Sequence, residues 1–382
     1  MEFRELGKTG LKVSAIGLGC EHLDGKPYAQ IEETINAAIE HDVNILDVFM
    51  PGKEIRENIA KALGNRRNKV IIQGHIGSTD IRQQYDISRD IPTVKRYFDD
   101  MLRIFGGFID LGMMFFIDSE EDYKNVFETD FVKYVEHLKM QGYIGHIGFS
   151  SHNPAIAIKV INTGLPDMLL FSINPAFDML PSEEYIFDHF ENGFDPELFR
   201  GIDPKRAELY KLCTKKQIGI TVMKTLGGGK LLLPEHTPFA KPLTVAQCIH
   251  YALSRPAVAS VMLGCQTPGE ILNAMRYFEL DDSEKDYAEI LGTMRNDFKG
   301  NCVYCSHCQP CPAGIDIATV NKYLDIARLD SAHIPPSIRS HYLGLAHSGS
   351  DCVKCGNCEK RCPFGVPIIK NMEEAERLLG NN

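Results

Sequence analysis

Two short runs in the last quarter of the sequence hold eight of its twelve cysteines. In each run, three cysteines are separated from one another by two residues, and a fourth stands directly before a proline. Three thiolates at this spacing can bind one face of a cubane, and a more distant cysteine can supply the fourth ligand. The pattern therefore predicts two [4Fe–4S] clusters and single-electron chemistry. The cysteines are Cys302, Cys305, Cys308 and Cys311 in the first run and Cys352, Cys355, Cys358 and Cys362 in the second.

Two other kinds of site use cysteines at similar spacing. Zinc is the main alternative, because Cys-x-x-Cys pairs also bind zinc. A zinc site usually takes two such pairs with a longer spacer, whereas each run here continues to a third cysteine and to a fourth before proline, which favours clusters. A disulfide framework is disfavoured, because the chain is long, its other four cysteines are scattered, and Met1–Gly10 lacks the apolar segment of a secretory leader.

The two runs resemble those of bacterial two-cluster ferredoxins, in which the cysteine before proline ligates the other cluster. The resemblance implies two crossed ligand sets: Cys302, Cys305, Cys308 and Cys362, and Cys352, Cys355, Cys358 and Cys311. The first run departs from the pattern, with two residues rather than three before its last cysteine. Between the runs we expect a helix over Ile315–Ala327 and a polar stretch over Leu329–Ser350. We expect His307 to tune the first cluster rather than to ligate it.

Length and charge restrict the class of protein. A chain of 382 residues with 44% hydrophobic residues suits one large domain and a small one. The formal net charge of −10 argues against nucleic acid as the main partner, because a phosphate backbone needs a basic face. The most apolar stretch, Phe108–Ile117, is too short to span a bilayer. We therefore expect a cytoplasmic protein with no membrane partner.

Apolar runs alternate with amphipathic stretches over the first three quarters of the chain, as parallel strands and their covering helices should. The strands are expected at Val13–Leu18, Val43–Val48, Val70–Gly74, Phe108–Met113, His146–Phe149, Met168–Phe171, Ile218–Met223 and Ala259–Leu263. The helices are expected at Ile31–Glu40, Glu54–Ala62, Ile91–Ile104, Tyr123–Met140, Pro154–Thr163, Pro204–Lys215, Val245–Ser254 and Pro268–Phe278.

Eight such units predict an α/β fold, a (β/α)8 TIM barrel over residues 1–290. A small helical, ferredoxin-like iron–sulfur domain follows over residues 291–382, with the boundary near Leu291–Lys299. The alternative, an open doubly wound sheet, fits less well, because no Gly-x-Gly-x-x-Gly follows the first strand.

Several motifs of the barrel region resemble the aldo/keto reductase family, and the tail resembles the branch of that family with a C-terminal 4Fe–4S segment. The motifs are Arg4-Glu-Leu-Gly-Lys-Thr-Gly10, Ile16-Gly-Leu-Gly19, Asn44-Ile-Leu-Asp47, Ile147-Gly-Phe-Ser-Ser-His-Asn153 and Val222-Met-Lys-Thr-Leu-Gly-Gly-Gly229. Together they cover about residues 1–280 in the family's order. The resemblance implies hydride transfer from NADPH to a carbonyl by an Asp, a Tyr, a Lys and a His.

This sequence keeps little of that catalytic set. Asp47 matches the aspartate, but Met50 and Pro51 stand where the tyrosine is expected. His75 replaces the lysine, and a phenylalanine, Phe115 or Phe116, replaces the histidine. Because phenylalanine cannot transfer a proton, ordinary carbonyl reduction by the family's mechanism is not expected.

The resemblance also implies a nucleotide site that is half preserved. Ser150 and Ser151 match the pair that contacts the nicotinamide amide, and Lys224 falls where an aromatic residue normally stacks on nicotinamide. The stretch Leu226, Gly227, Gly228, Gly229 and Lys230 matches the phosphate loop, and Asn273 matches an adenine contact. The site is thus expected to bind NADP(H) with altered chemistry or a flavin (FMN or FAD); the alternative is a glycine loop kept for its backbone geometry alone.

Asp47 and His75 are expected at the carboxyl ends of neighbouring strands, where barrel chemistry takes place. A carboxylate beside an imidazole can work as an acid–base pair near neutral pH, or the two can merely satisfy each other's hydrogen bonds.

Three functions remain open from the sequence. The first is an oxidoreductase that passes electrons between an electron-transfer protein, the clusters and a barrel site acting on a small-molecule substrate. The second is an NADPH-dependent carbonyl reductase with structural clusters. The third is a catalytically disabled, redox-sensing binding protein.

Overall fold

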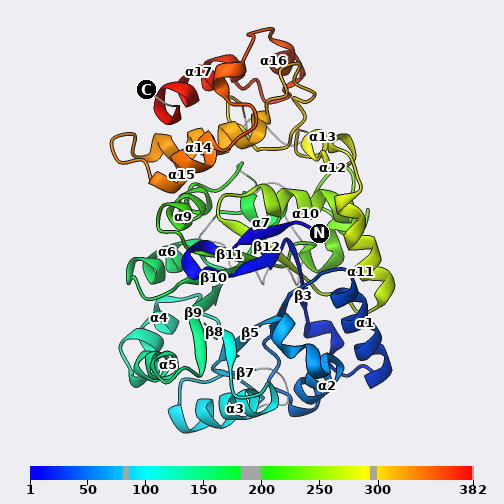
Figure 1. Cartoon of the computed structure of the whole chain (residues 1–382), viewed down its shortest axis with the longest axis vertical. Coiled ribbons are helices and arrows are strands. Elements are labelled where there is room, and N and C mark those ends of the chain that lie inside the picture. The colour runs from blue at the N-terminus through cyan, green and yellow to red at the C-terminus, as the bar shows by residue number, and fades with distance from the viewer. Residues whose placement is uncertain (81–85, 182–198, 200, 293–298, 381–382) are drawn as a thin grey trace. The chain divides into compact units, whose positions relative to one another are not determined.

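The computed structural model describes residues 1–380 except 81–85, 182–198, 200 and 293–298 (Figure 1). The chain forms two compact units. The first contains Met1–Ile173, Gln217–Thr225 and Ala257–Glu279, and the second contains Asn174–Lys216, Leu226–Pro256 and Leu280–Asn382. The predicted boundary near Leu291–Lys299 falls mostly on residues outside the described part, and the division at residue 290 stays a prediction.

The first unit contains a closed barrel of eight parallel strands, which confirms the predicted TIM barrel. Each predicted strand is present, with its bounds shifted by a few residues at most. Around the barrel the strands run in the order β3 (Ile16–Gly19), β4 (Ile45–Val48), β5 (Ile71–Ile76), β8 (Ile109–Met114), β9 (Ile144–Ser151), β10 (Met168–Ser172), β11 (Gly219–Met223) and β12 (Val258–Leu263), and β12 pairs with β3.

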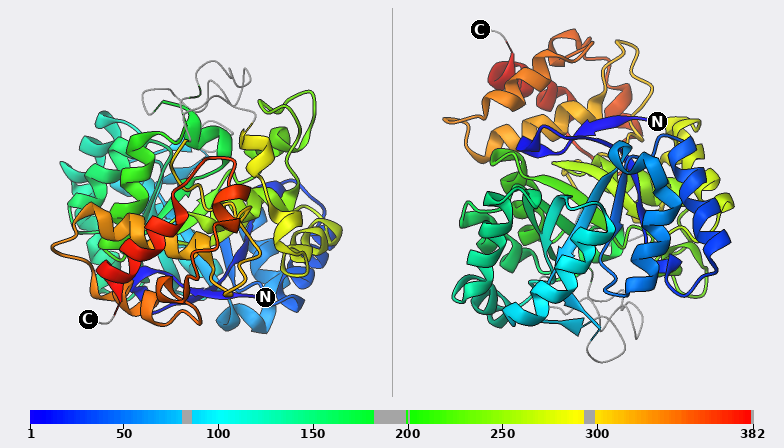
Figure 2. Two further views of the ribbon diagram at one scale, coloured as in Figure 1. Left: turned by 90° about the horizontal axis from the view of Figure 1, so that it is seen from above. Right: turned by 60° about the horizontal axis from the view of Figure 1, so that its bottom comes forward.

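Seven helices of this unit have one apolar face, and the right-hand view of Figure 2 shows the first of them, in blue and cyan, outside the strands. They are α1 (Tyr28–Glu40), α2 (Lys53–Leu63), α3 (Ile91–Ile104), α4 (Glu120–Phe127), α5 (Asp130–Met140), α6 (Pro154–Asn162) and α11 (Pro268–Met275). The single helix predicted over Tyr123–Met140 is wrong. The chain breaks it at Thr129, which is extended and whose side chain caps α5 by accepting from the Phe131 N–H.

The barrel interior is filled by apolar side chains from several strands, including Ile45, Leu111, Met168 and Ala259. An antiparallel pair, β1 (Phe3–Glu5) and β2 (Lys12–Ser14), precedes the first barrel strand. Gly7 follows β1 in the left-handed region with φ +55°, and a Cβ there would lie 2.3 Å from the Gly219 nitrogen. Only glycine allows the two backbones to approach so closely.

The second unit is helical, with α7 (Pro175–Met179), α9 (Pro204–Lys215), α10 (Val245–Ser254), α12 (Asp282–Lys285), α13 (Ala288–Gly292), α14 (Ile317–Leu329), α15 (Pro336–Leu343), α16 (Asn357–Arg361) and α17 (Ile368–Leu379). Asp316 caps α14, which is the helix predicted between the cysteine runs. The stretch over Leu329–Ser350, described from the sequence only as polar, contains α15. The amide of Asn371 on α17 donates to Asn321 on α14 at 2.7 Å, in the buried face between these helices.

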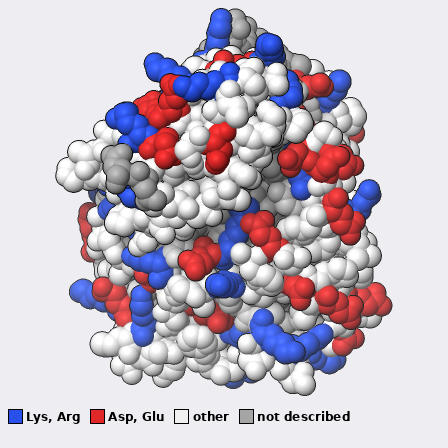
Figure 3. All heavy atoms as spheres, turned by 45° about the horizontal axis from the view of Figure 1, so that its top comes forward, with Lys and Arg blue, Asp and Glu red and all other residues white. Residues whose placement is uncertain are grey.

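None of the described helices is both long and apolar enough to span a bilayer. On the face drawn in Figure 3, Lys and Arg side chains are interspersed with Asp and Glu side chains rather than gathered into one basic band.

Candidate functional site

Asp47 and His75 meet at the carboxyl ends of β4 and β5, which pair in parallel. His75 Nε2 lies 2.8 Å from Asp47 Oδ1, and both side chains are buried. The same carboxylate oxygen accepts from the Gln73 amide at 2.6 Å, and the Gln73 carbonyl accepts from the Thr221 hydroxyl at 2.9 Å. A buried hydrogen-bonded chain therefore runs from β11 through β5 to the imidazole and fixes its orientation.

The second ring nitrogen of His75, Nδ1, is buried and has no hydrogen-bond partner among the described residues. With Asp47 ionised, its oxygen accepts the Nε2 proton, so a neutral His75 presents a lone pair at Nδ1. Buried polar atoms are nearly always paired, and an exception calls for an explanation such as a ligand or an ordered water. The free nitrogen can take a proton from, or return one to, a group bound beside it.

Aromatic rings surround this imidazole. The rings of Phe49 and Phe115 stack with centroids 5.7 Å apart, and each meets the His75 ring edge-on, at 6.0 and 5.3 Å. These apolar neighbours lower the local polarity and strengthen the Asp47–His75 interaction.

The carboxyl ends of β3 and β4 supply no alternative proton donor at the positions that the sequence singled out. Met50 and Pro51 are both buried, and the Met50 carbonyl accepts from the buried Arg56. Burial raises the pKa of the Cys20 thiol well above its usual value, and the charge of Asp47 adds to the effect. A raised pKa favours the neutral thiol over the nucleophilic thiolate at this position.

The two serines at the end of β9 already form hydrogen bonds within the protein. Ser150 Oγ accepts from the Phe116 N–H at 2.8 Å, and Ser151 Oγ donates to Asp118 at 3.0 Å. Phe116 has φ +56°, a left-handed conformation that is uncommon for a residue with a large side chain. The serines thus support the turn after β8, and their predicted contact with a cofactor stays a prediction.

A second carboxylate–imidazole pair, Asp118 and His152, was missed by the sequence reasoning. His152 Nδ1 lies 2.8 Å from Asp118 Oδ2, and the His152 N–H donates to Oδ1. Burial alone would raise the pKa of Asp118, but the charge of His152 and the hydrogen bonds from His152 and Ser151 hold this pKa below its usual value. Asp118 follows β8 and His152 follows β9, so the reasoning that paired Asp47 with His75 could have found them.

Of the remaining predicted contacts, Lys224 directly follows β11 with φ +59°, and its Nζ lies 3.9 Å from Glu21 Oε2. Asn273 is exposed on α11. The loop Leu226–Lys230 belongs to the second unit, and its three glycines all have positive φ, between 57° and 84°. Successive left-handed residues of this kind direct backbone N–H groups to one side, as anion sites require.

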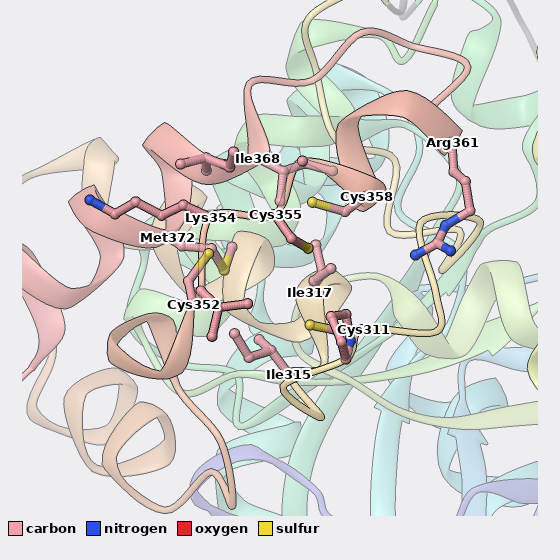
Figure 4. Close-up of a pocket in the computed structure, with 14 residues that line it drawn as sticks. Cys311, Ile315, Ile317, Cys352, Lys354, Cys355, Cys358, Arg361, Ile368 and Met372 are labelled. Carbon is pink, nitrogen blue, oxygen red and sulfur yellow. The ribbon is translucent and has the colours of Figure 1, made fainter.

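The eight cysteines of the two runs line two separate hollows. One hollow is lined by Cys311, Cys352, Cys355 and Cys358, and Figure 4 shows their sulfur atoms facing a common space. The other is lined by Cys302, Cys305, Cys308 and Cys362. We call these the exposed set and the buried set, because Cys355 is exposed whereas Cys305 and Cys308 are buried. Each set takes its fourth cysteine from the other run, as the crossed ligation requires.

The two runs share one backbone pattern. The residue before the second cysteine has positive φ in both, Tyr304 at 59° and Lys354 at 56°. The residue after it does as well, Ser306 at 62° and Gly356 at 73°. Three of these four residues carry side chains and adopt an uncommon conformation. In the first run it lets the Tyr304 N–H donate to Cys302 and the His307 N–H to Cys305. N–H groups turned toward sulfur form the nest-like surroundings seen at many Fe–S sites.

Two family models match this chain. The model described as the aldo/keto reductase family matches residues 15–244, more than half of the chain. The model described as a 4Fe-4S dicluster domain matches residues 301–367, which include both cysteine runs.

Among curated proteins, the chain is similar to the uncharacterized oxidoreductase YqkF of Bacillus subtilis, with 27% identity over 201 residues, 48% of this chain and 59% of that protein. The match spans less than two thirds of the relative's own length. Among solved structures, the holo form of aldo-keto reductase AKR11C1 from Bacillus halodurans has a TM-score of 0.57 at 20% identity, covering 75% of this chain and 94% of that chain. A putative aldo-keto reductase from Pseudomonas aeruginosa has a TM-score of 0.54 at 18% identity, covering 72% and 95%. The structural likeness shows a shared fold.

Proposed function

This chain belongs to the aldo/keto reductase family and carries a 4Fe-4S dicluster domain, and from that premise we propose an electron path for this oxidoreductase. Two [4Fe–4S] clusters exchange single electrons with an external carrier protein and with a nucleotide or flavin site at the carboxyl end of the barrel. There the Asp47–His75 pair handles the protons of a small-molecule reaction. The observation that carries the proposal is the gathering of eight cysteines into two sets of four around two hollows.

The placing of the cysteines supports clusters over single zinc ions. A tetrahedral zinc site brings four sulfurs within about 2.3 Å of one point. Among the described residues, no three His, Cys, Asp or Glu side chains are placed to hold one metal ion. The four cysteines of each set instead line a hollow together with apolar side chains such as Ile317 and Ile368. The inward-turned N–H groups of the first run also suit an anionic iron–sulfide group. We propose that Cys302, Cys305, Cys308 and Cys362 hold one cluster and that Cys311, Cys352, Cys355 and Cys358 hold the other.

The barrel site would need a converter between one-electron and two-electron chemistry. A flavin supplies this when bound, whereas nicotinamide accepts hydride. Within the second unit, the three left-handed glycines of Leu226–Lys230 direct backbone N–H groups that we propose as donors to a phosphate. His75 Nδ1 would transfer the proton, Asp47 would stabilise the imidazolium that forms, and Phe49 and Phe115 would keep water away.

The test is chemical and spectroscopic. Protein purified without oxygen is assayed for iron, sulfide and zinc, its noncovalent cofactors are extracted, and the dithionite-reduced sample is examined by EPR. The proposal expects about eight iron and eight sulfide atoms per chain and an extractable flavin or nicotinamide. Zinc in place of iron, or clusters with no affinity for either cofactor, would overturn it.

A second candidate function is NADPH-dependent carbonyl reduction with structural clusters. It is favoured by the same glycine loop and by the placing of Asp47 at the end of β4. It predicts turnover of simple aldehydes with NADPH after the clusters are removed. Failure across a broad carbonyl panel would exclude it.

A further inference from the structure

A buried network of charged and phenolic side chains runs through the second unit toward the first cysteine run. It begins at Asp178 in α7, whose carboxylate accepts from the Tyr251 hydroxyl at 2.8 Å and from Arg206 at 3.2 Å. Tyr251 lies in α10, and the guanidinium of Arg255, at the end of this helix, is 4.4 Å from the centre of the Tyr251 ring. Each of these side chains is at most 2% exposed.

Arg255 reaches from this network into the cysteine run itself. Its Nη2 donates to the backbone carbonyl of Val303 and to the Tyr287 hydroxyl, and Tyr287 donates to the same carbonyl at 2.9 Å. The Arg255 guanidinium also lies 5.1 Å from the centre of the Tyr304 ring. Val303 lies between Cys302 and Cys305 and lines the hollow of the buried set.

The Val303 carbonyl and the Tyr304 N–H belong to one peptide unit, and that N–H donates to the Cys302 sulfur. A cation that donates to the carbonyl polarises the peptide, which makes its N–H a stronger donor. Hydrogen bonds to cluster sulfurs and nearby positive charge both favour the reduced, more negative cluster. Arg255 acts in both ways at once.

We propose that Arg255 raises the reduction potential of the cluster in the buried set above that of the cluster in the exposed set. The inference rests on the two proposed clusters and adds the direction in which electrons pass between them. An electron supplied by a one-electron carrier protein enters at the exposed set, and passes to the buried set. The cluster of the exposed set is reoxidised as the cluster of the buried set is reduced, and no covalent bond forms or breaks.

The cationic side chains beside the exposed set should have a smaller electrostatic effect on their cluster than Arg255 has on the other. Lys354 has its side chain 61% exposed and pairs with Glu373 at 2.6 Å. Arg361 lines this hollow but is only half-buried, and it donates to the carbonyls of Cys308 and Pro310. Solvent screens exposed charges much more than buried ones. The buried Arg255 is therefore the charge with the larger effect on a cluster.

Two carboxylates also face the first run, and both have partners. Asp286 pairs with His307, and its backbone carbonyl accepts from Gln247 at 2.6 Å. Asp325 accepts from the Tyr304 hydroxyl at 2.8 Å and pairs with Arg328. The cationic and hydrogen-bonding partners offset the negative charge of these two carboxylates. Arg255, in contrast, donates directly to the Val303 carbonyl between two of the cysteines.

The test is a redox titration of the intact, cluster-loaded protein followed by EPR. In R255Q the equilibrium constant for one-electron reduction of the buried cluster is expected to fall about tenfold, which corresponds to about 59 mV, while the exposed cluster is unchanged. R255K keeps the charge and should recover most of the shift. R377Q removes an arginine whose side chain is 67% exposed in the same unit and should leave both potentials unchanged.

Because R255Q removes a buried side chain, D178N provides an independent test. It neutralises the carboxylate of the network without changing its shape, leaves the Arg255 cation less compensated, and should shift the buried cluster to higher potential. Opposite shifts in R255Q and D178N support the inference, or the D178N shift alone if R255Q does not fold. An unshifted buried cluster in either folded variant, or shifts of the same sign, overturns it. A wild-type protein without two clusters would instead overturn the proposed function.

Discussion

The imidazole of His75 is held by Asp47 through one ring nitrogen, at 2.8 Å, while its other nitrogen is buried with no partner among the described residues. The pair lies at the ends of β4 and β5. A base that is oriented by a carboxylate on one side and open on the other has the geometry of a general acid–base catalyst. We propose that this pair takes the role of the tyrosine and lysine that the family resemblance would place here.

Replacing His75 by glutamine should abolish the proton step without affecting the clusters. Loss of a general acid–base group typically lowers kcat by about 10²- to 10⁴-fold, so H75Q should show a loss in that range in turnover driven by an artificial electron donor. The matched control is H41Q at the end of α1, where the ring contacts the Ala37 carbonyl. Iron content should be the same in the wild type, H75Q and H41Q. An unchanged kcat in H75Q would show that His75 takes no part in the mechanism.

The crossed ligation can be tested with single cysteine variants. C362S lies in the second run but should remove the ligand of the cluster bound by the first run, and C311S should do the reverse. Each variant should lose or convert one of two clusters, about half of the iron, and EPR should identify different survivors. C213S, a buried cysteine of α9 outside the runs, is the control. If C362S instead damages the cluster of Cys352 and Cys355, ligation follows the runs and is not crossed.

A pair of glycine variants separates backbone strain from nucleotide binding. Gly229 and Gly10 both have positive φ, +84° and +74°, and an added Cβ meets nothing within 4 Å at either position. G229A and G10A should therefore each lose about 1–2 kcal/mol of stability in denaturant unfolding. Only G229A should weaken binding of NADP(H) or flavin, as measured by calorimetry. Equal affinities in the two variants would mean that the loop is kept for its shape alone.

The Asp118–His152 pair predicts a pH-dependent contribution to stability. The pKa of Asp118 is lowered on folding, so its ionised form stabilises the protein above the unfolded pKa of about 3.9, and this contribution is lost as pH falls through the folded pKa. D118N should lower the free energy of unfolding by about 3 kcal/mol. The deficit should be constant between about pH 5 and 7 and shrink only below about pH 4. A deficit that shrinks already well above the unfolded pKa of Asp118, about 3.9, would contradict this account.

The barrel was predictable from the sequence because its signals are local. Continuous apolar runs such as Val43–Val48 mark strands buried on both faces, and the end of a strand fixes where Asp47 lies. The break between α4 and α5 was not predicted, since one threonine cap decides it against an otherwise helical pattern. The helix α15 was not predicted for a different reason. It buries only Ile338 and Tyr342, so its apolar face is too small to stand out within a polar stretch.

The site was predictable only in part. The cysteine spacing gave the eight thiols, and strand order gave Asp47 and His75. His75 Nδ1 has no partner among the described residues, and the two rings beside the imidazole, Phe49 and Phe115, come from two other strand ends, which no local pattern brings together. Likewise, Arg255 meets the Val303 carbonyl across 48 residues of sequence, a contact that no local pattern marks.

The most direct test of the account is whether electrons held by the clusters reach the barrel. Dithionite-reduced protein, freed of excess reductant, is mixed without oxygen with oxidised FMN or FAD, which can accept electrons from the clusters one at a time, and cluster absorbance is followed by stopped flow. The account predicts reoxidation of the clusters and a matching reduction of the added cofactor. Clusters that stay reduced while the cofactor is bound would contradict it.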